Sequence, residues 1–360
     1  MRIEEVDRNF RLQNSVPEDV VFYDVREEPF TLEGLTPNGE GSFCRLPLSL
    51  LPKLSEGMQM LAWHLAGGVV RFATDAQELF LNWVLKDPTV MPHFTACGQS
   101  GMELFSVGED GRAEWVRTVI PQTDNGKGVL LHQMTRVPLP GELRSYMLYL
   151  PLYNGLEKLE IGVGHGAGIL GDQTRRRYLH PIVFYGSSIT QGGCAAKAGS
   201  AYSAVMCRTL NAPCVNLGFS GNARGEKEMA EFVAGLSMSA MILDYDHNAR
   251  SVRELQDTHE AFFRTVRKAH PDLPVLVVSR PDPHPCEEDR QRLEIIRTTV
   301  RHALEAGDRR VRFVDGGRLL EGPERDMCLV DGTHPTSMGF YRMARVLLSE
   351  LAELGVGPSA

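Results

Sequence analysis

A regular alternation of two kinds of segment in the second half of the chain constrains the fold most. Short apolar runs, of the length of buried strands, alternate with amphipathic segments of helical periodicity. The apolar runs cover 181–186, 212–219, 240–245, 274–279 and 312–316, and the helical segments lie near 201–210, 225–236, 253–270, 287–306 and 337–354. This alternation predicts βαβ units and a mainly parallel sheet, with reactive side chains at the carboxyl ends of the strands.

The first half of the chain has a different pattern. Its short apolar or alternating runs are separated by turn residues and show little helical periodicity, which is typical of an antiparallel β-sandwich or jelly roll. These runs cover 69–74, 79–85, 129–134 and 146–153. A glycine-rich and then basic segment over 164–177 marks the change between the two patterns. We therefore predict an all-β domain over 1–165, a linker over 166–180 and an α/β domain over 181–360.

The charge balance excludes two classes of partner. The chain has 38 Lys and Arg against 46 Asp and Glu, a formal net charge of −8. Such a chain lacks the basic excess that attracts a phosphate backbone or an anionic bilayer. We therefore expect neither nucleic acid nor membrane among its partners.

Cysteine usage and the N-terminal sequence predict the compartment. The seven cysteines include no CxxC pair, so they suggest neither a disulfide framework nor a thiolate zinc site. The N-terminus is too acidic and polar for a signal peptide, and no run approaches the roughly 18 apolar residues that span a bilayer. We expect a cytoplasmic protein, and the sequence leaves open whether it forms a homo-oligomer.

The first candidate for chemistry is the serine-containing turn that follows the apolar run 181–186. The turn reads GSSITQGG from Gly186 to Gly193. It lacks the Gly-Lys-Ser/Thr of a phosphate loop, and Thr190 stands where the motif GxSxG needs its last glycine. Taken alone, a serine here could simply cap the following helix.

The second candidate is Asp331-Gly332-Thr333-His334, just before the final helical segment. An aspartate three residues before a histidine on a turn can reach Nδ1 and leave Nε2 facing outward. The same spacing also fits a surface Asx-turn with an incidental histidine.

Two further strand ends carry small and polar residues. Gly221 and Asn248 follow the second and third apolar runs, and a glycine N–H and an asparagine amide are donors that a tetrahedral oxyanion needs. Asp246 and His247 are adjacent, so their side chains point apart on an extended segment, and no second cluster of ligands accompanies them. We predict no metal site.

Taken in chain order, these strand ends supply serine, glycine, asparagine, and aspartate with histidine. That order resembles the SGNH hydrolases, also called the GDSL lipase/acylhydrolase family, over residues 181–354. The matching positions are Ser188 for the block I nucleophile, Gly221 for block II, Asn248 for block III, and Asp331 with His334 for the DxxH of block V. The resemblance implies a flavodoxin-like, three-layer α/β fold.

The first half carries a second resemblance. Gly101-Met102-Glu103-Leu104-Phe105 is similar to the GxDLY motif of a β-sandwich domain that precedes one subgroup of these hydrolases. The segment 150–155, Leu-Pro-Leu-Tyr-Asn-Gly, is also similar to that domain. The two resemblances together imply an esterase or acyltransferase with an accessory jelly roll, a group whose members often act on O-acetylated carbohydrates.

These resemblances imply a serine esterase that needs no cofactor. Ser188 would attack the ester carbonyl, His334 would act as the base and Asp331 would orient it. The backbone N–H groups of Ser188 and Gly221 and the Asn248 amide would hold the oxyanion. We expect short acyl groups, acetyl foremost, on a small-molecule or oligosaccharide ester, because no amphipathic lid helix lies near the motifs.

Three positions are candidates for substrate binding. Ser187 replaces the usual aspartate of block I and His247 the usual glycine of block III, so both bear on substrate preference. Glu103 would point away from Met102 and Leu104 on a strand. Its carboxylate could face the catalytic cleft, pair with a basic residue across the domain boundary, or serve the sandwich alone.

Two alternative functions remain open from the sequence. The same acyl-enzyme could pass its acyl group to an alcohol, which would make the protein an acyltransferase. The α/β half could instead be the scaffold of a non-catalytic carbohydrate-binding protein, although every position expected to react is present.

Overall fold

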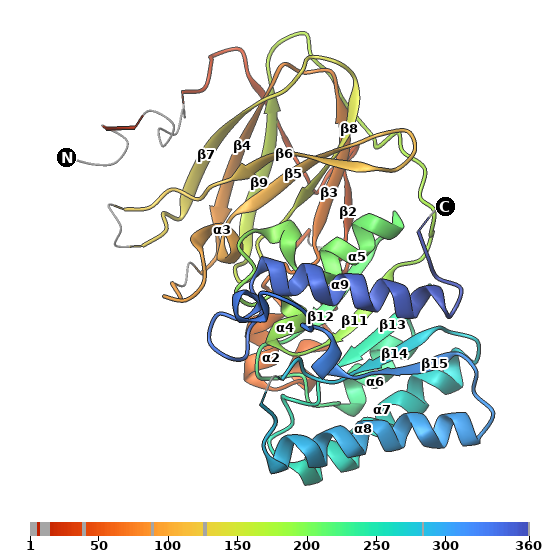
Figure 1. Cartoon of the computed structure of the whole chain (residues 1–360). Helices are drawn as coiled ribbons and strands as arrows, with labels where there is room; N and C mark the ends of the chain where they lie inside the picture. The colour runs from red at the N-terminus through yellow and green to blue at the C-terminus, as the bar shows by residue number, and fades with distance from the viewer. Residues whose placement is uncertain are drawn as a thin grey trace.

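The protein consists of an antiparallel, sheet-rich half and an α/β half (Figure 1). The structure, a computed structural model, describes residues 6–7, 15–37, 41–87, 90–124, 128–282 and 284–358. Among these residues no helix is long and apolar enough to cross a membrane. The α/β half follows the other half in the sequence, as the change of pattern predicts.

The first half is a sandwich of two antiparallel sheets, which confirms the all-β prediction. One sheet has the order β1 (Val21–Asp24), β9 (Leu156–Val163), β4 (Glu78–Leu85), β7 (His132–Pro138). The other has the order β10 (Ile169–Leu170), β3 (Val69–Thr74), β8 (Arg144–Tyr149), β5 (Met102–Val107), β6 (Ala113–Val119), and β2 (Thr31–Glu33) pairs with β3. Trp83 and Leu159 of the first sheet pack with Phe72 and Leu148 of the second in one buried core.

The second half contains a five-stranded, entirely parallel sheet. Its order is β12 (Cys214–Gly218), β11 (Ile182–Gly186), β13 (Ala240–Asp244), β14 (Val275–Val278), β15 (Val311–Val314). In chain order this is 2-1-3-4-5, the flavodoxin-like arrangement, in which ligands bind at the carboxyl ends of the strands. The mainly parallel α/β prediction is confirmed.

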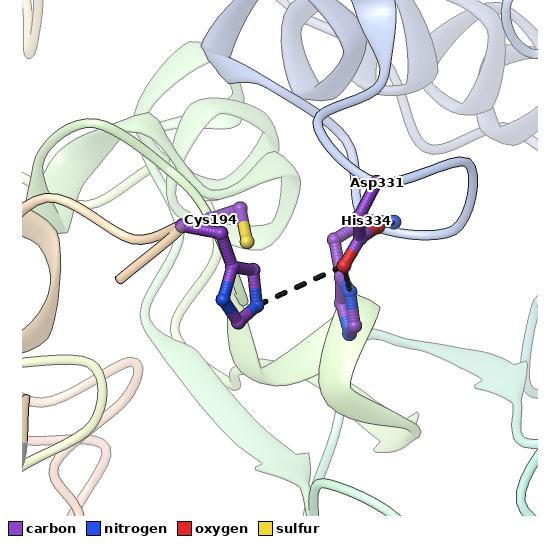
Figure 2. A group of neighbouring side chains, drawn as sticks. Cys194, Asp331 and His334 are labelled. Carbon is purple, nitrogen blue, oxygen red and sulfur yellow. Dashed lines mark hydrogen bonds and ion pairs between the residues drawn. The ribbon is translucent and has the colours of Figure 1, made fainter. Parts of the chain in front are cut away.

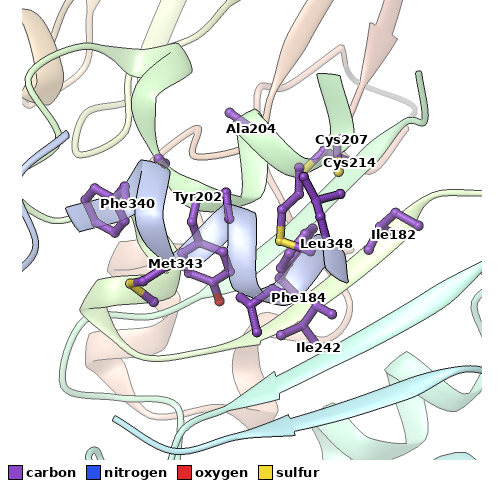
Figure 3. Close-up of a cluster of buried hydrophobic side chains, with 14 of the residues drawn as sticks. Ile182, Phe184, Tyr202, Ala204, Cys207, Cys214, Ile242, Phe340, Met343 and Leu348 are labelled. Atoms are coloured by element: carbon purple, nitrogen blue, oxygen red, sulfur yellow. The ribbon is translucent and has the colours of Figure 1, made fainter. Parts of the chain in front are cut away.

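Helices cover both faces of the parallel sheet. The α-helices are α2 (Glu56–Leu61), α3 (Ala96–Gln99), α4 (Ser188–Gln191), α5 (Tyr202–Leu210), α6 (Lys227–Ala234), α7 (Val252–Ala269), α8 (Glu287–Glu305) and α9 (Ser337–Ala352). The short 3-10 helices are η2 (Leu51–Lys53), η3 (Ala198–Ser200), η4 (Gly316–Arg318) and η5 (Arg325–Cys328). Figure 3 shows Phe340 and Met343 of α9 beside Tyr202 of α5, over Phe184 and Ile242 of the sheet. Residues of α6, α7 and α8 cover the opposite face.

The two halves share their buried cores. Phe105 and Tyr149 of the sandwich pack in the same cluster as Tyr202 of α5, so the α5 side of the α/β half lies against the sandwich (Figure 1). On the other face, Met58 and Leu61 of α2 pack with the α6–α8 cluster. The sandwich half is therefore built into the α/β half on both faces of the parallel sheet.

Arg45 stabilises the contact between the α2 segment and the parallel sheet. Its guanidinium is buried and donates to the carbonyls of Asn216 and Gly218, both at 2.8 Å, and of Leu61 at 2.7 Å. Burial lowers the pKa of Arg45 to about 10. Because Asn216 and Gly218 belong to β12, this arginine ties the α2 segment to the edge of the parallel sheet.

Part of the segment predicted as a linker is attached to the sandwich. Strand β10 pairs with β3, and Arg71 Nε donates to Asp172 at 2.6 Å. Arg176 pairs with Glu33 of β2. Residues 169–176 therefore run along the sandwich surface, and the two halves are not joined by a free tether.

Candidate active site

In the strand-to-helix turn after β11, the hydroxyls of two adjacent serines make different contacts. Ser187 Oγ accepts the Ile189 N–H at 3.2 Å and so caps α4. Ser188 is the first residue of α4, and its hydroxyl is free of that task. Gly186 precedes them at a place where a Cβ would lie 2.1 Å from Thr190 Oγ1 and 2.2 Å from the Asp244 carbonyl, so only glycine fits.

The loop before α9 brings a histidine and an aspartate to this serine. His334 Nε2 lies 2.9 Å from Ser188 Oγ, and His334 Nδ1 lies 2.8 Å from Asp331 Oδ2. Asp331 Oδ1 accepts the backbone N–H groups of Thr333 at 3.0 Å and of His334 at 2.8 Å. The Asx-turn and the contact of the Asp331 carboxylate with His334 Nδ1, which the sequence offered as alternatives, therefore occur together.

Hydrogen bonds stabilise the ionised form of the Asp331 carboxyl. Partial burial acts to raise the pKa of its carboxyl, but the bonds from the His334 backbone and ring and from the Thr333 N–H lower it to about 2. The carboxylate is therefore ionised across the neutral range, and it favours the tautomer of His334 with the proton on Nδ1. That tautomer leaves the Nε2 lone pair directed at Ser188.

Three donors expected for an oxyanion lie on the neighbouring strand ends. Asn248 Nδ2 donates one N–H to the Phe219 carbonyl at 2.9 Å, which leaves its second amide N–H available. Gly221 has φ +65, and a Cβ there would meet nothing within 4 Å. No described group accepts the backbone N–H of Gly221 or Ser188. The Phe219 carbonyl thus ties the second and third motifs together.

Gln191 is a positioning residue that the sequence did not single out. It is completely buried, and its Oε1 accepts the Ser220 N–H at 3.0 Å. Its Nε2 lies 3.2 Å from both the Leu152 carbonyl and His64 Nδ1. Gln191 therefore holds the residue before Gly221 against the end of the sandwich half.

The sandwich half supplies two more side chains to the site. Tyr153 OH donates to the Ser188 carbonyl at 3.2 Å. His93, in the loop before α3, has its Nε2 3.7 Å from Asp331 Oδ2, and its ring centroid is 6.1 Å from that of His334. No motif marks His93 in the sequence, because its contact is with Asp331, which lies 238 positions later in the chain.

The three residues predicted as candidates for substrate binding have different surroundings. Glu103 is buried, accepts the Gly199 N–H at 2.9 Å and pairs with Lys197, so its carboxylate lies at the domain boundary with a basic partner. Ser187 is buried as the cap of α4. His247 is half-buried and contacts Arg280. Burial, followed by the charge of Arg280, lowers the pKa of His247 to about 4.

One cluster in the described chain has the composition of a metal site. His93, Cys194, Asp331 and His334 each offer one ligand atom, and these atoms lie within 4.8 Å of one another. Figure 2 shows Cys194 on one side of this group and Asp331 with His334 on the other. From the sequence we expected no metal site, but that expectation concerned only CxxC pairs and the neighbours Asp246 and His247, and no motif links the three separate segments that carry these four residues.

Comparisons with known families agree with the two-part architecture. The profile of the GDSL-like Lipase/Acylhydrolase family matches residues 179–352. The GxDLY profile, described as the N-terminus of SGNH-hydrolase-type esterases, matches residues 20–169. No curated protein matches the chain.

Among solved structures, a protein described as a GDSL-like lipase from Bacteroides ovatus is similar over both halves. It is 29% identical, covers 95% of this chain and 100% of its own, and has a TM-score of 0.83. A salicylyl-acyltransferase from a tetracycline biosynthetic pathway is 20% identical, with coverage of 95% and 99% and a TM-score of 0.76. An acetyl xylan esterase from the rumen bacterium Butyrivibrio proteoclasticus is 15% identical, with coverage of 81% and 92% and a TM-score of 0.54. The last two share the fold.

Proposed function

We propose that the protein is a serine esterase for short acyl esters, O-acetyl groups on carbohydrates foremost. Residues 179–352 belong to the GDSL-like lipase/acylhydrolase family, and residues 20–169 belong to its GxDLY-type N-terminal domain. This family membership supports a carboxylic ester hydrolase. The main support is the hydrogen-bonded series from Ser188 through His334 to Asp331, with distances of 2.9 and 2.8 Å. These lengths match those of a nucleophile, its base and the group that orients the base.

In the proposed reaction Ser188 Oγ attacks the ester carbonyl while His334 Nε2 takes its proton. Asp331 keeps the ring oriented and stabilises the imidazolium that forms. The backbone N–H groups of Ser188 and Gly221 and the second amide N–H of Asn248 hold the oxyanion. His334 then gives its proton to the leaving alcohol, and water, activated by the same histidine, releases the acid from the acyl-enzyme.

The polar rim of the site supports a hydrophilic ester. The exposed polar groups beside His334 are the imidazole of His93 and the carboxylate of Asp331, whose side chains are 42% and 35% exposed, and the apolar side chain of Val330 is exposed beside them. Asn248 and His247 are half-buried on the neighbouring strand end. An alcohol with several hydroxyl groups can bond to such a rim, whereas a long acyl chain would leave these polar groups desolvated without partners.

The test is a comparison of ester substrates with Ser188→Ala as the blank. Initial rates are measured on 4-nitrophenyl acetate, butyrate and octanoate, and acetate release is measured on acetylated xylo-oligosaccharides and acetylated glucose. We expect rates to fall as the acyl chain lengthens, and acetate to be released from at least one sugar ester. A preference for octanoate would contradict the proposed acyl group, and inactivity on every acetylated sugar would contradict the proposed alcohol.

The same assay addresses acyl transfer, which uses the same acyl-enzyme. Candidate acceptor alcohols are added, and the ester products and free acid are quantified separately. An acceptor that diverts most of the acyl group from water would identify the protein as an acyltransferase. Turnover that is independent of added alcohols supports hydrolysis.

A further inference from the structure

The cluster of His93, Cys194, Asp331 and His334 has a spacing close to that of a coordination sphere. Its four ligand atoms lie within 4.8 Å of one another. In a tetrahedral zinc site the ligand atoms lie about 2.0–2.3 Å from the metal, and hence roughly 3.3–3.8 Å from one another. The widest pair would have to close by about 1 Å for the four side chains to enclose an ion, whereas His334 Nδ1 and Asp331 Oδ2, now 2.8 Å apart, would have to separate if both bind it.

The donor set selects among cations. One thiol, two imidazoles and one carboxylate form a mixed sulfur, nitrogen and oxygen site, which suits Zn²⁺. Calcium and magnesium prefer oxygen ligands alone. An ion can enter from solvent, because the side chains of His93 and Asp331 are 42% and 35% exposed, while Cys194 closes the buried side.

The backbone presents the thiol in an uncommon way. Cys194 has φ 71, and among the described residues only Asn211 and Glu324 are also non-glycine residues with positive φ. The turn is fixed by the Gly193 N–H, which donates to the Ser188 carbonyl at 2.8 Å. Glycine would adopt this conformation at lower cost, yet the chain places a thiol there, beside the histidine and aspartate (Figure 2).

We propose that this cluster binds Zn²⁺ and that zinc is a reversible inhibitor of the esterase. The inference rests on the function proposed above, because the ion would engage the two side chains that activate Ser188. An ion on His334 Nε2 would occupy the lone pair that accepts the serine proton. An ion on Nδ1 would shift the ring proton to Nε2, which could then only donate to Ser188. In both geometries Asp331 binds the metal and no longer orients the ring.

Binding also has a defined proton balance. The thiolate is the zinc ligand, so each ion that binds releases the Cys194 proton to solvent, whereas the carboxylate and neutral imidazoles bind without net loss.

The first experiment measures binding without reference to activity. Metal-free protein is titrated with ZnCl₂ by calorimetry and with Co²⁺ by absorption, because a Co²⁺–thiolate bond gives a charge-transfer band. We expect one ion per chain for wild type and for Ser188→Ala, and no thiolate band for Cys194→Ala. His93→Ala should bind at least about tenfold more weakly, since even outer-shell changes cost 10–100-fold in affinity. Cys286→Ser, which removes an exposed thiol elsewhere, is the matched control.

The second experiment measures ester hydrolysis in buffers of fixed free Zn²⁺. Saturating zinc should lower the wild-type rate by about 10²-fold or more, the size of a general-base contribution, and EDTA should restore it. The zinc concentration for half-inhibition should rise in Cys194→Ala and His93→Ala by the same factor as their dissociation constants, each variant being compared with its own zinc-free rate.

Three results would overturn the inference. They are failure of wild type to bind zinc stoichiometrically, a thiolate band that persists in Cys194→Ala, and equal zinc inhibition of wild type and Cys194→Ala. Near-ultraviolet circular dichroism checks that each variant is folded, and Cys194→Ser is a second variant at the same position. Failure of the proposed function looks different, because Ser188→Ala would then keep wild-type ester turnover while still binding zinc.

Discussion

The two adjacent serines after β11 differ in the effect that we expect from their substitution by alanine. Ser188→Ala should lower kcat by about 10⁴-fold or more without unfolding the protein, because nucleophile, base and orienting group act as a unit. Ser187→Ala removes the cap of α4, at a cost of about 1 kcal/mol, and should keep most of the activity. Initial rates on 4-nitrophenyl acetate, with thermal melts, measure both effects. If Ser187→Ala lost more activity than Ser188→Ala, the nucleophile would be Ser187 and not Ser188.

Asn248 makes a separate prediction about the oxyanion. Its amide gives one N–H to the Phe219 carbonyl, so the other is the one available to substrate. Asn248→Ala should reduce kcat by about 10²–10³ with little change in KM, as for loss of one oxyanion donor. His247→Ala is the neighbouring control, because its imidazole contacts Arg280. If His247→Ala proves the costlier change, the asparagine is not the donor.

The sequence predicted those residues of the site that belong to ordered motifs. The sequence points to Ser188, Asp331 and His334 because each motif has a local spacing and the motifs follow one another along the chain, and the structure brings these three side chains together. Gln191, Tyr153 and His93 were not predicted as parts of the site, although Gln191 and Tyr153 lie in quoted segments, since each acts through a contact with a residue distant in the sequence. Local patterns carry no information on such contacts.

At the scale of elements, the parallel strands were predicted more closely than the antiparallel ones. Each strand of the α/β sheet overlaps its predicted apolar run, because strands buried on both faces read as continuous hydrophobic segments. The run 129–134 overlaps only the start of β7, since Leu130 and Leu131 precede the strand and are exposed. Strand β6 carries Arg117 and an exposed Trp115, so its sequence gives no such signal.

The turn between α4 and α5 gives a prediction of its own. A Cβ on Gly193 would lie 3.1 Å from His334 Cδ2 and 2.9 Å from Tyr153 OH, so a side chain there presses on the His334 ring. The ring has to give by only a few tenths of an ångström, so Gly193→Ala should lower kcat by less than the roughly 10²-fold that a displacement of about 1 Å costs. Gly164→Ala, where a Cβ would meet nothing within 4 Å, should leave the rate unchanged. A fully active Gly193→Ala would show that the ring tolerates the displacement.

On the scale of the whole molecule, the shared cores predict one unfolding event. Phe105 of the sandwich packs with Tyr202 of α5, and Met58 of α2 packs on the opposite face of the sheet. Neither half can unfold without exposing the apolar surface of the other, so calorimetry should show a single transition with equal calorimetric and van't Hoff enthalpies. Two resolved transitions would mean that the halves are independently stable.

Buried histidines predict how stability depends on pH. Burial lowers the pKa of His259 to about 3, and burial with the charge of Arg45 lowers that of His64 to about 4. An unfolded histidine has a pKa of about 6.5, so below that pH the unfolded chain binds more protons and the free energy of unfolding falls. Burial raises the pKa of Asp246 to about 6, which opposes this trend between roughly pH 4 and 6.

The net effect is measurable by urea unfolding at pH 7 and pH 5. We expect the free energy of unfolding to be lower at pH 5, because the lowered pKa values of His259, His64 and His247 together outweigh the raised pKa values of the buried acids, which act in the opposite direction. Those acids are Asp246, Asp244 and Glu226. His259→Gln should show a smaller decrease over the same interval. An identical pH dependence in that variant would show that His259 does not carry the effect.

The bond from Tyr153 to the Ser188 carbonyl has a consequence for protein engineering. Accessory domains are often exchanged between enzymes as modules to change specificity. Here the boundary between the two halves passes through the proposed active site, since Tyr153 and His93 come from one half and Ser188 and Asp331 from the other. A chimaera that grafts a foreign sandwich onto residues 181–360 would have to retain the loop 91–95 and Tyr153, which contact Asp331 and Ser188. It would also have to retain the 45–62 segment, because the buried Arg45 holds the edge of the parallel sheet.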